Sequence, residues 1–243
     1  MIEVKNLTVK YDTADKTCAL NNISFSVNNG EKVALIGANG AGKSTLLLTL
    51  TGILAPVSGE IIIDNIKLNK KTLNDLRKKL GMVFQNPDDQ LFMPTVHEDI
   101  AFGPKNYGEK EETIEKSTDD ILKNFGISHL KNRLTHKLSG GEKRLVALAG
   151  ILVMNPSVIL MDEPSSFLDP KARRKLIGIL SELPQTMIIA THDLDMALEL
   201  CDRAILLKEG CIYSDMTAKE ILQDEKILED CDLELPISLY RRR

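Results

Sequence analysis

Residues Gly37–Ser44 read GANGAGKS, and the apolar run Val33–Ile36 comes directly before them. A second apolar run, Leu46–Leu50, follows, so the stretch has the order strand, glycine-rich loop, helix that a phosphate-binding loop requires. Glycines let successive backbone N–H groups turn toward a phosphate, and the start of the helix adds positive potential. Lys43 can then reach the β- and γ-phosphates, and the Ser44 hydroxyl can bind magnesium. The stretch therefore predicts a nucleotide-phosphate site at the end of a buried strand.

Short apolar runs alternate with longer helical patterns along the rest of the chain, which predicts an α/β fold with parallel strands. Three more continuous apolar runs are typical of strands covered on both faces: Val158–Met161, Met187–Ala190 and Ala204–Leu207. Near the N-terminus, Ile23, Phe25 and Val27 instead alternate with polar residues, and Glu60–Asp64 precedes an Asp-Asn turn. We therefore expect an α/β core with a mixed sheet and an N-terminal antiparallel β layer.

Residues 86–150 lack the strand signal. Apolar residues at helical spacing precede Gly126, a residue suited to ending a helix: Ile114, Ile121, Leu122 and Phe125. Two pairs have the spacing of a capping box, and each predicts a helix start: Thr95 with Glu98, and Thr217 with Glu220. A helical subdomain inserted into the α/β core is the expected arrangement.

These patterns divide the chain into four segments. Residues 1–85 and 151–214 would form the two parts of the core, 86–150 the helical subdomain, and 215–243 a short C-terminal helical tail. From Lys219 to Glu234 there are seven acidic residues against two lysines, and the chain ends with Arg241–Arg243. This composition predicts a solvated surface helix followed by a frayed tail.

The overall composition is that of an ordinary globular protein. The 243 residues are 43% hydrophobic and 27% charged, with a formal net charge of -4 and a sequence pI near 5.7. An acidic chain has no general attraction to polyanions, so a dedicated nucleic-acid partner is not expected.

The chain also lacks the patterns of membrane-spanning and secreted proteins. Its longest apolar stretch, Leu145–Met154, is far shorter than the roughly 20 residues of a spanning helix. The N-terminus shows no basic-then-apolar leader, so we expect a cytosolic location. The cysteines have no C-x-x-C spacing, so neither a disulfide framework nor a structural metal is expected: Cys18, Cys201, Cys211 and Cys231.

Two adjacent carboxylates follow the run Val158–Met161. In an α/β sheet the end of a strand delivers side chains to the ligand crevice. Asp162 is placed to hold magnesium, and Glu163 is placed to orient or deprotonate an attacking nucleophile. The alternative is an acidic strand end that is simply solvated. The presence of a phosphate-binding loop in the same chain disfavours this alternative.

A second glycine-rich sequence, LSGGE over Leu138–Glu142, precedes the predicted helix Lys143–Met154. It supplies another helix N-terminus suited to phosphate. Guanine-nucleotide switches would need an N-K-x-D base reader, and Asn69–Thr72 reads NKKT without the aspartate. Small-molecule kinases would not require the second motif. With both motifs in this order, the sequence closely resembles the ATP-binding subunits of ABC transporters over nearly its whole length.

The resemblance implies an ABC ATPase fold, a P-loop NTPase core that binds ATP and Mg²⁺, and a role for each matching residue. Tyr11 matches the aromatic residue that stacks on adenine, although a tyrosine of the core or of an edge strand is the alternative. Gln85 matches a glutamine that senses magnesium and water, and His192 a histidine that contacts the γ-phosphate. Magnesium would be held by Ser44, Gln85 and Asp162. The nucleotide-binding positions implied are Gly37, Asn39, Gly40, Ala41, Gly42, Lys43, Ser44, Thr45, Ser139, Gly140, Gly141 and Glu142.

Two positions depart from the family pattern. Glu142 ends the LSGGE motif where glutamine is commoner, and Phe167 stands where a small residue is frequent in the loop Ser166–Asp169 that communicates across the dimer. Neither change removes a group that hydrolysis needs. Both affect the contacts expected between two copies.

A narrower resemblance points to the energy-coupling-factor branch, especially its cobalt or nickel uptake ATPases. The stretches that carry it are Gln85–Phe92, Thr95–Pro104, Ala190–Ala197 and Glu234–Pro236. In such proteins the region around residues 85–102 receives helices of a transmembrane coupling subunit. The alternative is that Leu91, Phe92 and Met93 simply pack the helical subdomain.

The resemblance thus implies a peripheral ATPase subunit on the cytoplasmic side of the cell membrane. Two ATPase protomers, identical or related, would pair head-to-tail, with ATP held between Lys43 of one and Ser139 of the other. The membrane partners would be the coupling subunit and a substrate-binding subunit, and the solute would be cobalt or nickel. A vitamin transporter is one alternative. A soluble ABC ATPase acting on DNA or ribosomes is less favoured, because the chain has neither a coiled-coil insertion nor a second cassette.

Overall fold

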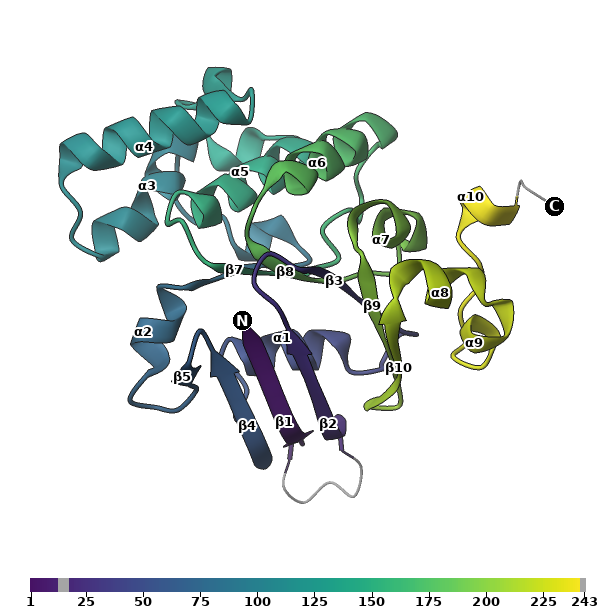
Figure 1. The fold of residues 1–243 in the computed structure, drawn as a ribbon. Helices are drawn as coiled ribbons and strands as arrows, with labels where there is room; N and C mark the ends of the chain where they lie inside the picture. The colour runs from purple at the N-terminus through teal and green to yellow at the C-terminus, as the bar shows by residue number, and fades with distance from the viewer. Residues whose placement is uncertain (13–17, 241–243) are drawn as a thin grey trace.

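The computed structural model describes residues 1–12 and 18–240, and a six-stranded sheet forms its centre (Figure 1). The strands, in the order in which they pair, are β10 (Cys211–Thr217), β9 (Arg203–Lys208), β3 (Lys32–Ile36), β8 (Thr186–Ala190), β7 (Val158–Asp162) and β6 (Leu80–Val83). Five of them run parallel, and β10 is antiparallel to β9, so the sheet is mixed as predicted. All residues of β7 and β8 are buried, which confirms the prediction from their continuous apolar runs.

A smaller antiparallel sheet forms a separate layer. Its strands, in pairing order, are β2 (Leu20–Val27), β1 (Ile2–Val9), β4 (Ser58–Ile63) and β5 (Ile66–Lys67). Along β2, Ile23, Phe25 and Val27 are buried between exposed residues, as the alternation predicted. Asp64 and Asn65 both have positive φ, 48° and 63°, which suits the tight turn between β4 and β5.

Helices cover the main sheet on both faces. Helix α1 (Lys43–Leu50) lies between the two sheets, where Leu46, Leu47 and Leu50 join one apolar cluster with both. On the opposite face lie α5 (Gly140–Leu152), α6 (Pro170–Glu182) and α7 (Leu194–Leu200) (Figure 1). This layering places the carboxyl ends of the central strands at the start of α1.

Within residues 86–150 the regular structure is helical, as expected. The α-helices are α3 (Val96–Asn106), α4 (Glu111–Asn124) and α5. Short 3₁₀ turns lie at Pro87–Asp89, Ser128–Leu130 and Thr135–Lys137. Before this region, α2 (Leu73–Arg77) precedes β6. Thr95 and Glu98 form the predicted capping box, and α4 ends just before Gly126, whose φ is 62°. These helices share one apolar cluster with a face of the main sheet. The limits of a separate subdomain stay a prediction.

The helix predicted at Lys143–Met154 begins earlier than expected. It starts at Gly140, because the side chain of Ser139 accepts the backbone N–H of Glu142 and caps the first turn. The LSGGE pattern by itself predicts only a phosphate motif at Ser139 and Glu142. Their S-x-x-E spacing is also a capping-box signal.

The prediction of a solvated helix over Lys219–Glu234 is wrong. Thr217 and Glu220 do form the expected capping box, but two short helices follow, α8 (Ala218–Gln223) and α9 (Glu225–Glu229), before α10 (Ile237–Tyr240). Four side chains of this region are completely or almost completely buried in the apolar cluster that α5, α6 and α7 share with the main sheet: Ile221, Leu222, Leu228 and Cys231. Burial of these apolar side chains determines where the C-terminal segment lies, while its acidic side chains remain on the outer side of the segment. Residues 241–243 lie outside the described residues, and among the described helices none combines the length and apolarity needed to cross a bilayer.

Candidate active site

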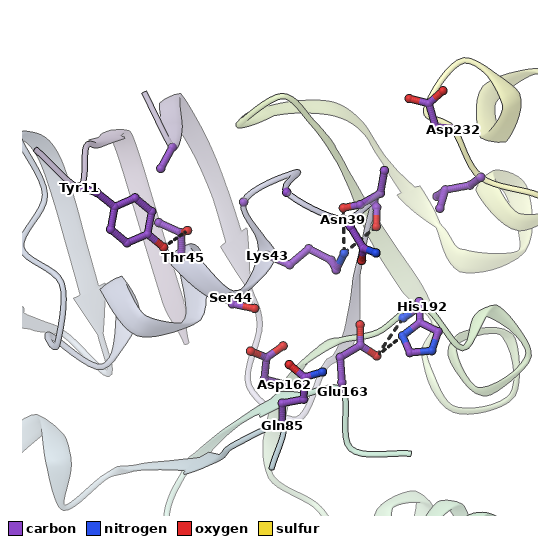
Figure 2. Close-up of a pocket in the computed structure, with 16 residues that line it drawn as sticks. Tyr11, Asn39, Lys43, Ser44, Thr45, Gln85, Asp162, Glu163, His192 and Asp232 are labelled. Atoms are coloured by element: carbon purple, nitrogen blue, oxygen red, sulfur yellow. Dashed lines mark hydrogen bonds and ion pairs between the residues drawn. The ribbon is translucent and has the colours of Figure 1, made fainter. Parts of the chain in front are cut away.

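A cleft of about 730 Å³ opens where the carboxyl ends of the central strands meet α1 (Figure 2). It brings together most of the residues singled out from the sequence: Tyr11, Gly37, Asn39, Gly40, Gly42, Lys43, Ser44, Thr45, Gln85, Asp162, Glu163 and His192. Ala41 belongs to the same loop but is buried beneath it. The residues of the LSGGE motif do not line this cleft.

The loop 37–44 needs glycine at two positions for steric reasons. Gly37 has a φ of 152°, and a Cβ there would lie 2.4 Å from the carbonyl oxygen of Leu207. Gly42 has a φ of 107°, and a Cβ there would lie 2.7 Å from the side chain of Leu20. Gly42 is also the N-cap of α1 and has no side chain to accept the first N–H groups of the helix. These donors are therefore available to an anion.

Lys43 curls back over the loop that carries it. Its ammonium donates to the carbonyl oxygens of Gly37 and Ala38, at 2.6 and 3.1 Å. Burial lowers the pKa of Lys43, and the charges of Glu163 and Asp162 oppose that shift. The ammonium is thus held against the phosphate-binding loop itself, where a phosphate-binding lysine acts.

Tyr11 stands at the other end of the cleft from His192 (Figure 2). It lies beyond the end of β1, and its side chain is 67% exposed, so the alternative of a core or strand tyrosine is wrong. The hydroxyl groups of Tyr11 and Thr45 are 2.8 Å apart and share a hydrogen bond. This bond fixes the edge of the ring and leaves its face open to a flat ligand.

Oxygen donors gather beside the loop. Asp162 ends β7 and forms a hydrogen bond with Ser44, and Gln85 lines the same wall just beyond β6. Burial raises the pKa of Asp162, and the hydrogen bond from Ser44 opposes that shift. A hydroxyl, a carboxylate and an amide are hard oxygen ligands, so this donor set fits Mg²⁺.

Glu163 and His192 form the far wall of the cleft. Oε2 of Glu163 lies 2.7 Å from Nδ1 of His192 and also accepts the backbone N–H of His192, at 3.1 Å. Glu163 has a φ of 47°, a region that non-glycine residues rarely adopt, and its N–H donates to Ala190 in β8. The strained turn thus aims a carboxylate into the cleft just after the buried strand.

The LSGGE motif is at the start of α5, away from the cleft. The Oγ and the N–H of Ser139 both donate to one carboxylate oxygen of Glu142, at 2.8 and 2.7 Å. The N–H of Ser139 in particular lowers the pKa of Glu142. Within a single copy, the second predicted phosphate site is therefore separate from the first, and its serine is engaged by Glu142.

The loop Ser166–Asp169 leads from the carboxylates into α6. Phe167 is 92% exposed and has a φ of 63°, while Asp169 caps α6 by accepting the N–H groups of Lys171 and Ala172. A large apolar side chain held this far into solvent is available for contact with another molecule.

Sequence reasoning missed several residues of the site. Ala19, Ala38, Asp232 and Leu233 also line the cleft. Asp232 and Leu233 come from the segment after α9, and no local pattern indicates that this segment returns to the cleft. Arg144 does not line the cleft but binds the backbone carbonyl of Gln85, and a charged residue inside an apolar helical run is a usable signal of such a role.

Comparisons with known proteins agree with this geometry. The family model described as ABC transporter matches residues 20–166. An ABC transporter ATP-binding protein of Geobacter sulfurreducens is 47% identical over 239 residues, which cover 98% of this chain and 95% of the relative. The energy-coupling factor transporter ATP-binding protein EcfA of Methanocaldococcus jannaschii is 45% identical over 241 residues, which cover 97% and 86%.

Solved structures show the same fold. The cbiO1 protein of Clostridium perfringens, described as part of the ABC transporter complex cbiONQ, has a TM-score of 0.84 and 40% identity, and the match covers 99% of this chain and 98% of cbiO1. The dimeric ATP-binding cassette MJ0796 bound to ADP and Pi has a TM-score of 0.81 and 31% identity, and the match covers 90% and 99%. The chain therefore belongs to the ABC transporter ATP-binding proteins, within their energy-coupling-factor branch, and is an ATPase of that family.

Proposed function

We propose that the chain hydrolyses ATP between two protomers, with Mg²⁺ held by Ser44, Asp162 and Gln85, to power solute uptake through a membrane transporter. The observation that carries this proposal is the cleft itself, which combines a phosphate-binding loop with the paired groups Glu163 and His192. When bound, Mg²⁺ supplies positive charge to the terminal phosphates.

In this proposal each side chain has one task. Lys43 and the N-terminus of α1 bind the phosphates, and Tyr11 offers its ring to the adenine. Glu163 orients or deprotonates the attacking water, which a carboxylate does best when it is held near the reacting atom. His192 fixes the Glu163 carboxylate by two contacts and is itself two-thirds exposed, so it can also meet the γ-phosphate.

Two protomers are needed because Ser139 lies outside the cleft of its own chain. A head-to-tail pair would bring Ser139 of one copy to the phosphates bound by Lys43 of the other. The dimeric MJ0796 cassette, which is bound to ADP and Pi, supports this arrangement. The Glu142 carboxylate that engages Ser139 would have to release it when the nucleotide arrives.

The membrane partner would dock on the helical face around Phe92. The Phe92 side chain is 63% exposed and packs edge-on against the ring of Phe102, with the ring centroids 4.6 Å apart. The N–H groups of Phe92 and Met93 donate to Asp99, which fixes the backbone while the Phe92 ring stays outside. The alternative, that these residues simply pack the helical subdomain, holds for Leu91, which packs against the apolar cluster, but does not fit Phe92. An amphipathic helix of a transmembrane coupling subunit matches this apolar surface.

Cobalt or nickel is the solute we propose, and a vitamin is the alternative. The support is the sequence resemblance at Gln85–Phe92 and Thr95–Pro104, together with the structural similarity to cbiO1 of the cbiONQ complex. In this arrangement the chain lies at the cytoplasmic side of the cell membrane as a peripheral subunit, beside the coupling subunit and a substrate-binding membrane subunit.

The test is to purify the chain with its membrane subunits from cells that express the whole transporter, then identify the subunits and any bound solute. Uptake of radioactive cobalt, nickel or vitamins is measured in the same cells. Uptake of a metal that stops with Glu163→Gln supports the proposal. Uptake of a vitamin alone selects the alternative, and a chain that purifies without membrane subunits contradicts both.

A further inference from the structure

Among residues 1–12 and 18–240, Arg144 has the largest fully buried side chain, at 2% exposure, and it lies in the first half of α5. Its Nη1 donates to the carbonyl oxygen of Phe84 and its Nη2 to that of Gln85, each at 2.6 Å. These two carbonyls follow Val83, the last residue of β6 that pairs with β7, so the sheet ladder does not satisfy them. The guanidinium of Arg144 supplies the hydrogen-bond donors that a neighbouring strand would otherwise provide to these two carbonyls.

The guanidinium is unusual because it is buried without a direct ion pair to another described residue, although Asp162 lies near enough for its charge to act on it. Among the described residues, no carboxylate forms an ion pair with Arg144, and its Nε has no hydrogen-bond partner. Burial lowers the pKa of Arg144 to about 10, and the charge of Asp162 opposes that shift, so the group stays cationic at neutral pH. A buried charge is costly, and an apolar side chain of similar size would serve packing alone. The buried charge instead serves to bind the backbone carbonyls of Phe84 and Gln85.

Other contacts tie the same segment to the same helix. The Gln90 side chain accepts the N–H of Phe84 at 3.3 Å and donates to the carbonyl of Ala147 at 2.9 Å. Lys143 pairs with Asp88 at 2.5 Å. Residues 84–90 are therefore joined to α5 at several points along one face of the helix.

This attachment connects two parts of the nucleotide machinery. The backbone of Gln85 is fixed by α5, while Gln85 lines the cleft near Asp162 and Glu163 (Figure 2). Ser139 caps the N-terminus of the same helix, only five residues before Arg144, or about 7.5 Å along the axis at 1.5 Å per residue. A shift of α5 must carry Ser139 and Gln85 together.

We propose that Arg144 is a positioning residue that makes Gln85 and Ser139 move as one unit, so that contact of Ser139 with the nucleotide of a second copy sets the place of Gln85 in its own cleft. This role rests on the proposed head-to-tail pairing. Arg144 touches no reacting atom and acts through the backbone of Gln85.

The experiment is a double-mutant cycle on ATP turnover by the purified transporter. Arg144→Met should lower kcat by about 10- to 100-fold, as expected when a catalytic group is displaced by about 1 Å, and should leave KM for ATP within about twofold. In a Gln85→Ala background, the same change should cause no further loss beyond about twofold, because Arg144 acts through Gln85. Arg174→Met removes an exposed arginine of α6 and serves as the control for loss of positive charge.

Arg144→Lys provides the second variant if Arg144→Met does not fold. Lysine keeps the charge but lacks the planar fork that reaches two carbonyls, so it should show the same non-additivity with Gln85→Ala at a smaller loss of kcat. Effects that multiply in either cycle would overturn the role of Arg144. Absence of solute uptake by the unchanged transporter would instead contradict the proposed function.

Discussion

The Nδ1 atom of His192 lies 2.7 Å from Oε2 of Glu163, and the backbone N–H of His192 donates to the same oxygen at 3.1 Å. Glu163 therefore does not turn freely, because one of its oxygens is held while the carboxylate lines the cleft. This is the arrangement expected of a base whose position has been set before the nucleophile arrives.

Glu163→Gln should retain ATP binding and lose turnover by about 10²- to 10⁴-fold, the range associated with a positioned general base. Glutamine keeps the shape and can still contact His192, but it takes no proton. Single-turnover hydrolysis and size-exclusion chromatography with ATP measure the two effects, and an ATP-bound dimer should accumulate. Glu199→Gln, an exposed pair partner of Arg174, is the matched control. Hydrolysis by Glu163→Gln at the parent rate would show that the role is misassigned.

Lys43→Ala and Ser139→Arg chains should complement one another. Each homodimer carries a defect in both of its sites, whereas a mixed dimer places both lesions at one interface and leaves the other intact. Mixing equal amounts should restore ATPase activity to a fraction of that of the unchanged protein. If mixed dimers form and remain inactive, either the two protomers do not share their sites or both sites must hydrolyse ATP together.

Glu142→Gln should bind ATP more tightly in the dimer by about two- to fivefold, corresponding to the ~0.3–1 kcal/mol that a charge near a helix N-terminus contributes. Glutamine can keep the cap on Ser139, yet it removes a negative charge beside the proposed phosphate position. The same change should lower thermal stability slightly, because the start of α5 loses a favourable anion. KM for ATP and the melting temperature measure the two effects, and an unchanged or raised KM would contradict the prediction.

Phe92→Asp should release the membrane subunit while basal ATPase activity largely survives. A carboxylate in an apolar contact costs on the order of several kcal/mol unless it finds a partner. Tyr240→Asp, which changes an exposed aromatic residue of α10, is the control. Co-purification and uptake are the measurements. Unfolding of the isolated subunit would show that Phe92 supports the fold rather than docking, and an intact complex with normal uptake would exclude it from the coupling surface.

Thiol reactivity should separate the cysteines by burial. Burial raises the pKa of Cys201 to about 12, so at pH 8 this thiol is almost entirely protonated and unreactive. Cys211 is exposed and should react with iodoacetamide in the native protein. Mass spectrometry of native and urea-unfolded samples checks this, and modification of Cys201 before unfolding would contradict the burial described.

The sequence was sufficient for the fold and for most of the cleft, since the signals there are local. The loop 37–44 and the carboxylates Asp162 and Glu163 are read from consecutive residues at strand ends, and parallel strands bring such ends together. The C-terminal segment was misjudged because its charged residues outnumber the apolar ones that anchor it, such as Leu228. Asp232 reaches the cleft through tertiary contacts that have no periodic signature. The link from Arg144 to Gln85 joins residues 59 positions apart and is visible only in three dimensions.

The position of β3 within the main sheet has a consequence for synthesis on the ribosome. The strand that carries the nucleotide loop pairs with β8 and β9, which are made about 150 to 175 residues later. Both edges of β3 thus lack partners until almost the whole chain has left the exit tunnel. Nucleotide can therefore stabilise this protein only after translation is nearly finished, and an unfinished chain exposes an apolar strand that chaperones must protect.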